Sequence, residues 1–119
     1  MSTMWLVRNA TTGRVLAWRV RRAEGWLERA LGFLARSSIA PEEGLWFEGC
    51  SAVHTVGMRT AIDMVFLDKD HRVVKVEANV GPHKLCVGAR NARTVAEFGL
   101  GFAKANPLQP GDLLTLEPV

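Results

Sequence analysis

Ile62-Asp63-Met64-Val65-Phe66-Leu67 is the stretch of this sequence that decides the fold. Apart from Asp63, its residues are apolar on both faces of an extended chain, which is typical of a central strand covered on both sides. Burying a lone carboxylate is costly, so Asp63 must be paired, hydrogen-bonded or partly hydrated. We expect it to accept backbone N–H groups from the turn at 58–61. Its candidate side-chain partners are Arg59, Thr55 and His54.

Alternation of apolar and polar residues on both sides of this stretch predicts further strands with one face in water. Past a polar turn, residues 74–80 place a valine or alanine at every second position, which predicts the second strand of a hairpin. Residues 14–22 alternate too, with Leu16, Trp18 and Val20 predicted to face the core and arginines to face water. The shorter candidate strands lie at residues 4–9, 44–48, 51–56, 85–87, 94–96 and 113–116.

The apolar period changes to that of a helix in two places. After Gly25, apolar residues recur every three or four positions, which predicts one principal amphipathic helix over about 25–36. A short second helix is predicted over about 99–105, ahead of Pro107. These elements predict an α+β fold that is mainly β. We expect a compact single domain over residues 1–119, arranged as a β-sandwich or part-closed barrel.

The length and composition of the chain exclude several classes of protein. Its 119 residues suit one domain, and 48% hydrophobic with 23% charged residues excludes disorder as the main state. No apolar run approaches the ~18 residues of a membrane-spanning helix, and the N-terminus lacks a secretory signal. We therefore expect a soluble cytoplasmic protein in which Cys50 and Cys86 are reduced thiols.

Positive charge is concentrated near the N-terminus. Residues 1–36 hold seven arginines against two glutamates, a net charge of +5, whereas the remainder has a net charge of −2. Such asymmetry suits a polyanion such as nucleic acid, bound through an arginine-rich face, or a solvated strand surface that deters aggregation. The sequence has no interleaved aromatic and basic motif, which favours the second interpretation. The residues of the candidate face are Arg14, Arg19, Arg21 and Arg22.

The stretch Ile62–Asp68, followed by Val73-Val74, resembles the core of a bacterial and archaeal family known only as domain of unknown function 192. Other motifs extend the resemblance over most of the chain. They are Arg29-Ala30-Leu31-Gly32-Phe33-Leu34, Gly44-Leu45-Trp46-Phe47, Val80 with Pro82, Ala96-Glu97-Phe98 and Gly111-Asp112. Many members carry Trp-Met-Lys-Asn-Thr before the central strand, whereas this chain has His54-Thr55-Val56-Gly57-Met58 and so resembles a variant branch. The resemblance implies a compact β-rich fold without a cofactor and brings no established activity.

The leading functional hypothesis is a small non-enzymatic domain that binds a ligand or partner in a polar pocket. The pocket is expected near His54, Thr55, Asp63 and Glu97. Asp63 and Glu97 match acidic positions of the family pattern, and a carboxylate within so apolar a strand suits a pocket floor. We expect a monomer or weak dimer.

A second hypothesis is a thiol- or carboxylate-dependent hydrolase that uses Cys50, His54 and Asp63. A thiol needs a nearby base to become a nucleophilic thiolate, and a carboxylate can orient that base. The spacing Cys-x-x-x-His is unspecific, and no oxyanion-hole loop is evident. The alternative interpretation is structural, with Cys50 a small buried residue and His54 a hydrogen-bonded histidine of a strand.

A zinc site is the remaining chemical possibility. Two thiols and two imidazoles would suit tetrahedral zinc, and the four residues form two closely spaced pairs. Neither pair has the spacing of a standard zinc ribbon or finger, so the sequence favours no metal. The candidate ligands are Cys50, His54, His83 and Cys86.

Overall fold

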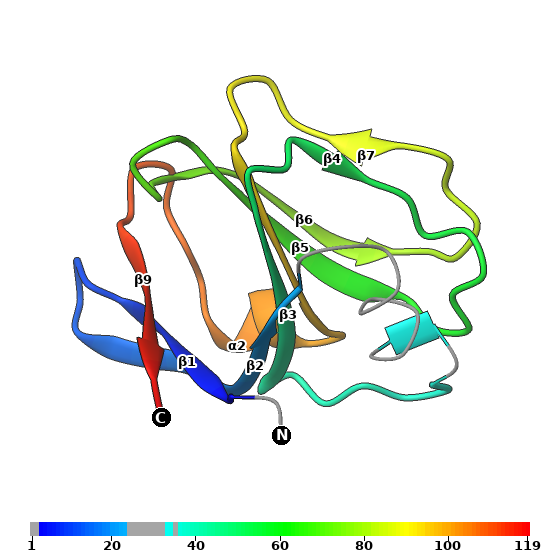
Figure 1. Cartoon of the computed structure of the whole chain (residues 1–119), viewed down its shortest axis with the longest axis horizontal. Helices are drawn as coiled ribbons and strands as arrows, with labels where there is room; N and C mark the ends of the chain where they lie inside the picture. Colours follow the sequence, from blue (N-terminus) through cyan, green and yellow to red (C-terminus); the bar gives the residue numbers. More distant parts are fainter. Residues whose placement is uncertain (1–2, 24–32, 35) are drawn as a thin grey trace.

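The computed structural model describes residues 3–23, 33–34 and 36–119. In this part of the chain, seven strands form one curled sheet, and two short strands form a ribbon beside it (Figure 1). The sheet order is β6-β5-β8-β3-β2-β1-β9, and the ribbon pairs β4 with β7. The strands are β1 Trp5–Asn9, β2 Arg14–Arg22, β3 Glu43–Glu48, β4 Ala52–Val53, β5 Ile62–Leu67, β6 Val73–Val80, β7 Val87–Gly88, β8 Thr94–Gly99 and β9 Leu114–Pro118. The principal helix predicted over about 25–36 lies almost wholly outside the described residues.

Strand β5 is buried along its whole length, as its sequence predicted. Its side chains alternate between two hydrophobic clusters, one on each face of the sheet. Val65 and Leu67 join the cluster inside the curl, together with Trp46 of β3. Met64 and Phe66 join the cluster on the outer face, which packs against residues of the ribbon such as Val53 and Val87. The double burial of β5 therefore gives the small domain two cores.

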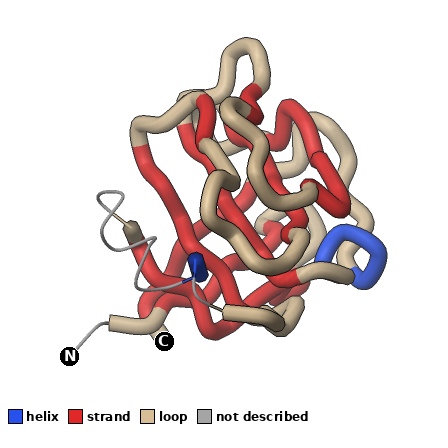
Figure 2. The backbone as a smooth tube through the Cα atoms, turned by 90° about the vertical axis from the view of Figure 1, so that its right-hand side faces the viewer, coloured by secondary structure: helices blue, strands red, loops and turns tan. Residues whose placement is uncertain are grey.

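The sheet is curled and stays open (Figure 2). Its edge strands, β6 and β9, do not pair, and contact is made where the two strands start. Within the described residues, Arg72 and Leu113 form an isolated antiparallel bridge beside the starts of β6 and β9. The N–H group of Val73 donates to the Asp112 carbonyl at 2.8 Å, and that of Leu114 to the His71 carbonyl at 3.0 Å. The predicted mainly-β fold is therefore confirmed, as a curled sheet that does not close.

The alternation predicted for residues 14–22 is wrong at Trp18, whose side chain is 53% exposed. The pairing of β1 with β2 shifts, since Trp5 lies opposite Val20 whereas Val7 lies opposite Ala17. One extra residue on β2 is thus accommodated, and a second follows at once, because Arg8 lies opposite Val15. Such bulges change which side chains face inward. Ala17 is consequently buried, and the tryptophan faces outward.

The second predicted helix is shorter than the sequence indicated. Helix α2 spans Phe102–Ala105, because Gly99 still belongs to β8 and Gly101 takes a left-handed backbone conformation with φ of 100°. The ring of Phe102 stacks on Phe98 at 3.8 Å between centroids, which holds α2 against the inner core.

Asp63 joins three elements through its buried carboxylate. Oδ1 accepts the N–H of Asn79 at 2.8 Å, and Oδ2 accepts the N–H groups of Gly101 at 3.2 Å and Ala103 at 2.9 Å. Asn79 lies where β6 bulges away from β5, with φ of 54°. The carboxylate therefore satisfies a bulge in β6 and the first turn of α2, and does not cap the turn at 58–61.

We predict that Asp63→Asn lowers the free energy of unfolding by about 2–3 kcal/mol, because an amide nitrogen cannot accept a hydrogen bond from a backbone N–H. Chemical denaturation monitored by circular dichroism measures the change. Asp70→Asn removes a carboxylate charge from an exposed turn and is the matched control. Equal stability of the two variants would contradict the assigned role.

Glu48 organises the end of the sheet where the edges meet. Its carboxylate accepts hydrogen bonds from His71 Nε2 at 2.8 Å, Thr94 Oγ1 at 2.8 Å and Trp46 Nε1 at 3.1 Å. Partial burial alone would raise the pKa of Glu48, but these hydrogen bonds outweigh it and hold the pKa below its usual value of 4.5. The ionised form of Glu48 therefore stabilises the fold.

We predict that Glu48→Gln destabilises the protein at pH 6 by roughly 0.5–1 kcal/mol, a small effect because solvent screens this part-exposed group. A lowered pKa contributes stability above the unfolded-state value, and that stability is lost as pH falls through the folded-state value. The difference between wild type and variant should hence shrink between pH 5 and pH 3. Urea denaturation at several pH values tests this, and a constant difference would refute it.

Candidate functional site

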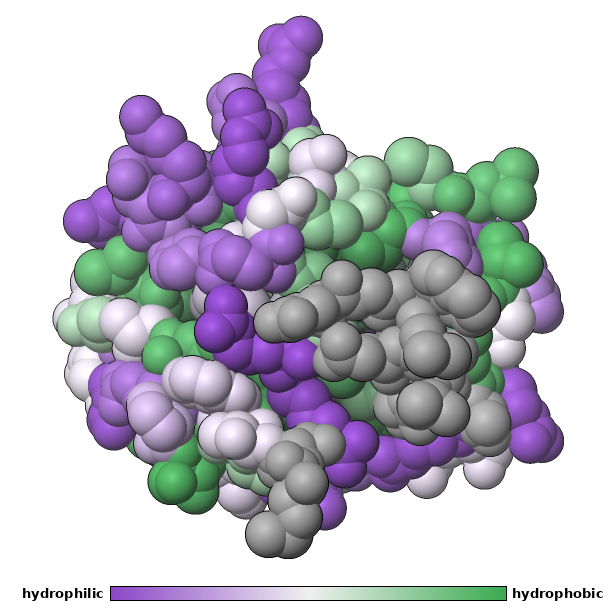
Figure 3. Space-filling model, in the orientation of Figure 1, coloured by the Kyte–Doolittle hydropathy of each residue, from purple (hydrophilic) through white to green (hydrophobic). Residues whose placement is uncertain are grey.

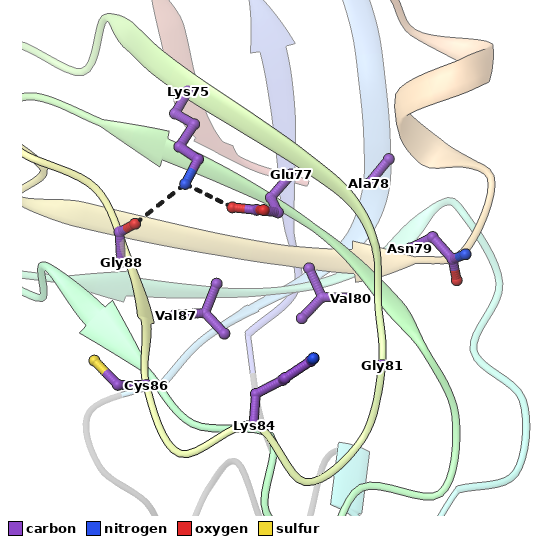
Figure 4. A pocket seen from close by; sticks show the side chains of 10 residues that line it. All are labelled: Lys75, Glu77, Ala78, Asn79, Val80, Gly81, Lys84, Cys86, Val87 and Gly88. Atoms are coloured by element: carbon purple, nitrogen blue, oxygen red, sulfur yellow. Dashed lines mark hydrogen bonds and ion pairs between the residues drawn. The ribbon is translucent and has the colours of Figure 1, made fainter.

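A cleft of about 530 Å³ lies between β6 and β7 and is the candidate functional site (Figure 4). Its volume falls in the range of about 300–1,000 Å³ that is typical of small-molecule sites. The lining residues are Lys75, Glu77, Ala78, Asn79, Val80, Gly81, Lys84, Cys86, Val87 and Gly88.

The cleft exists because two strand edges face each other without pairing. β6 is the edge strand of the sheet, β7 belongs to the ribbon, and the chain at 81–86 connects them. At the end of the cleft away from this connection, the Lys75 side chain crosses from β6 to β7. Its Nζ donates to the Gly88 carbonyl at 3.4 Å and forms an ion pair with Glu77 Oε2 at 2.7 Å. Val80 and Val87 line the cleft with apolar side chains, and both also pack with the outer core.

Thr55, which the sequence singled out, fixes one wall of the cleft from behind. Its buried hydroxyl donates to the Gly81 carbonyl at 2.8 Å and accepts the N–H of Lys84 at 2.8 Å. Its own N–H donates to the Lys84 carbonyl at 2.8 Å, and its carbonyl accepts the N–H of His83 at 2.9 Å. Thr55 does not line the cleft, but it determines the shape of the 81–84 wall.

Asp63 fixes the opposite wall in the same indirect way. Its Oδ1 holds the N–H of Asn79, and Asn79 lines the cleft near the end of β6. Both walls are therefore anchored to buried polar side chains.

The charges around the cleft leave one cation uncompensated. Lys75 and Glu77 neutralise each other in their ion pair. The Lys84 side chain extends into the cleft (Figure 4), and its Nζ makes no hydrogen bond or ion pair with any described residue. A single positive charge beside apolar surface can recognise a ligand that combines a negative group with an apolar body.

Asp63 and Glu97 do not share one pocket. In the pairing of β5 with β8, Asp63 lies opposite Phe98, and Met64 lies opposite Glu97. Because successive side chains point to opposite faces, Asp63 faces the inner core with Phe98, whereas Glu97 is fully buried on the outer face beside Met64. His54 is exposed beside Thr55. The predicted polar pocket is thus divided between two faces of the sheet.

The structure does not assemble the predicted hydrolase triad within the described residues. The Cys50 thiol is half-buried and donates to the Ala52 carbonyl at 2.9 Å. The buried carboxylate of Asp63 accepts backbone N–H groups from Asn79, Gly101 and Ala103, and no hydrogen bond joins it to His54. No hydrogen bond connects the three side chains in this part of the chain.

The four candidate zinc ligands do not come together as a metal site among the described residues. No group of three or more histidine, cysteine, aspartate or glutamate side chains among the described residues is arranged to hold a metal ion. Of the four, Cys86 lines the cleft, and His83 is an exposed residue of the connecting loop with φ of 67°.

The arginines predicted to form one face make separate contacts. Arg14 donates to the Ala105 carbonyl at 3.2 Å, and Arg22 lies 5.5 Å from the centre of the Trp5 ring. Arg19 pairs with Glu42 and Glu43. Across the described ranges, no helix has the length and apolar character needed to cross a membrane.

Lys84 and Lys75 were not among the residues that the sequence indicated. A cleft between unpaired strand edges depends on strand order, which hydrophobic periodicity does not reveal. The only local signal is Gly81-Pro82, which ends β6 and directs the chain away from β5.

Proteins similar to this chain come from archaea and bacteria. It is 30% identical over 112 residues to a UPF0127 protein of Pyrococcus furiosus, with 89% of this chain and 93% of the relative covered. A UPF0127 protein of Pyrococcus abyssi is 29% identical over 100 residues, covering 79% and 82% of the two chains.

Two solved structures share the fold. A protein of unknown function from Novosphingobium aromaticivorans is 26% identical with a TM-score of 0.74, covering 94% of this chain and 83% of that one. A protein from Sinorhizobium meliloti, described as a candidate transcription regulator, has a TM-score of 0.77 at 24% identity over 98% and 94% of the two chains. At that identity the likeness shows the fold alone. Residues 7–116 match DUF192, an uncharacterised conserved family, and the chain belongs to it.

Proposed function

We propose that this protein is a non-enzymatic binding domain and that the β6–β7 cleft holds a small carboxylate with an apolar body. The observation that carries the proposal is a cleft of about 530 Å³ lined by Lys84, Val80 and Val87, in which the Lys84 ammonium group pairs with no described residue. The ammonium group of Lys84 would receive the carboxylate, and the two valines would contact the apolar body.

The anchored walls support binding, because a preformed site avoids the entropic cost of ordering its walls around a ligand. Thr55 and Asp63 fix these walls through hydrogen bonds of 2.8 Å to Lys84 and Asn79. The cleft offers less to catalysis: its carboxylate, Glu77, is paired with Lys75, and no described histidine or carboxylate hydrogen-bonds to Cys86.

We predict that Lys84→Met weakens binding of such carboxylates by about 10–100-fold, because a charge-assisted hydrogen bond contributes about 1.5–3 kcal/mol. A panel of branched aliphatic and aromatic carboxylates is screened by thermal shift, and the hits are titrated calorimetrically. Met keeps the aliphatic stem of lysine but removes its charge. Lys69→Met, at an exposed turn outside the cleft, is the matched control.

Cys86 provides an independent readout of where the ligand sits, since it lines the cleft and is exposed. In a Cys50→Ser background, a bound carboxylate should slow maleimide labelling of Cys86. The proposal fails if no member of the panel binds. It fails equally if binding persists unchanged in Lys84→Met or leaves the labelling rate unaltered.

We also predict that Thr55→Val destabilises the fold by about 1–3 kcal/mol, because the Gly81 carbonyl and Lys84 N–H lose a buried partner. Hydrogen exchange should quicken at the amides of His83 and Lys84, and carboxylate affinity should fall although Thr55 does not line the cleft. Thr60→Val, whose hydroxyl contacts only the Ala61 carbonyl among described residues, is the control. Unchanged exchange in the 81–84 wall would count against this role.

A further inference from the structure

A second cavity of about 260 Å³ lies on the β2–β3 surface, and it shares no lining residue with the β6–β7 cleft. A band of hydrophilic surface crosses the lower centre of the molecule in Figure 3, near where β2 and β3 lie in Figure 1, and apolar areas lie beside it. The lining residues of the cavity are Met4, Arg19, Arg21, Phe33, Arg36, Glu43, Gly44 and Leu45.

The parallel pairing of β2 with β3 places two of these arginines side by side. Arg19 lies opposite Glu43, and Arg21 lies opposite Leu45. Because side chains two positions apart share a face of a strand, Arg19 and Arg21 border the same cavity. The third arginine, Arg36, arrives from the chain that follows Phe33.

Glu43 ties two of the three arginines into one network. Its carboxylate accepts two hydrogen bonds from Arg36 and one from Arg19 at 3.4 Å. The Arg36 guanidinium lowers the pKa of Glu43, so the carboxylate is ionised at neutral pH. Arg19 also pairs with Glu42 at 3.1 Å. Two glutamates therefore balance two arginines in this network.

Arg21 is the cation that this network leaves uncompensated. It is exposed, and its guanidinium makes no ion pair or hydrogen bond with a described residue. A guanidinium has five N–H donors in a planar fork that matches the oxygens of a phosphate. The cavity thus holds a fork that no described residue engages, beside two further arginines that the glutamates keep in place.

We infer that this cavity is a binding site for a single phosphate-like oxyanion, with Arg21 as the principal ligand and Arg19 and Arg36 as supporting donors. The cavity has a volume of about 260 Å³. Pockets for drug-sized ligands typically have volumes of about 300–1,000 Å³, so this cavity suits one phosphate group better than a large molecule. Bidentate arginine–phosphate pairs are among the stronger hydrogen-bonded contacts in proteins.

The positions of the other arginines favour a discrete site over a continuous polyanion-binding face. Arg14 binds the Ala105 carbonyl, and Arg22 lies over Trp5, so neither lines this cavity. A polyanion would need the four arginines of β2 to act together. A small oxyanion needs only the two that share the β2–β3 cavity with Arg36.

Calorimetric titration with inorganic phosphate, sulfate and glycerol phosphate, each at 50 mM salt, tests the inference. Arg21→Gln should weaken binding of each oxyanion at least tenfold, whereas Arg14→Gln should change it less than twofold. Arg21 is exposed and has no described partner, so its variant should fold normally, with thermal melting as the check. Tighter binding of glycerol phosphate than of inorganic phosphate would identify a phosphomonoester as the ligand. Equal binding would identify the free anion.

Four results would overturn the inference. The first is no oxyanion binding at 10 mM. The second is an equal loss of oxyanion binding in Arg14→Gln and Arg21→Gln, which would indicate diffuse electrostatics. The third is tight binding of a single-stranded oligonucleotide with steep salt dependence, which would also indicate diffuse electrostatics. The fourth is loss of oxyanion binding in Lys84→Met, which would place the anion in the β6–β7 cleft.

Discussion

The rest of the structure depends on one constraint: the carboxylate of Asp63 is buried within an apolar strand and must be satisfied there. Three backbone N–H groups, from Asn79, Gly101 and Ala103, supply what water would otherwise provide. Those donors belong to a bulge in β6 and to the first turn of α2, elements that follow β5 in the chain. A polar atom in the core thus fixes where β6 bends and where α2 begins. An apolar residue at this position would leave both sets of donors without an acceptor.

The bend in β6 has a consequence for the shape of the molecule. An edge strand normally pairs with another strand or is protected from doing so. Here β6 meets the chain before β9 at its start, and its residues Lys75 and 77–80 line the open cleft across from β7. Lys75 spans one end, and the loop held by Thr55 forms the other. The proposed ligand site therefore arises because the sheet does not close at β6, and two buried polar side chains, Thr55 and Asp63, hold its walls in place.

The sequence predicted those features that depend on local pattern and missed those that depend on register. The apolar character of β5 correctly indicated burial on both faces, and the sequence marked Asp63 as a carboxylate in an apolar strand that needs hydrogen-bond partners. Thr55 was predicted as a partner of Asp63 or of a ligand, whereas its hydroxyl bonds Gly81 and Lys84. The partners of Asp63 and Thr55 lie 16 to 40 residues away, where periodicity gives no information. The pairing of β5 with β8 decides that Asp63 and Glu97 face opposite cores. Trp18 was misplaced for the same reason, because the bulge in β2 becomes visible only against β1.

The arginines of β2 show how register turns a charge run into separate sites. In the sequence, Arg19, Arg21 and Arg22 form one dense basic segment. Because side chains alternate along the strand, Arg22 points to the opposite face from Arg19 and Arg21. Parallel pairing with β3 then gives Arg19 and Arg21 different neighbours. Arg19 meets Glu43, whereas Arg21 meets Leu45. A register one residue different would face Arg21 with another neighbour and alter the charge balance of the cavity. Among the described residues, the unpaired guanidinium of Arg21 thus follows from strand pairing, which the excess charge of the N-terminal third cannot specify.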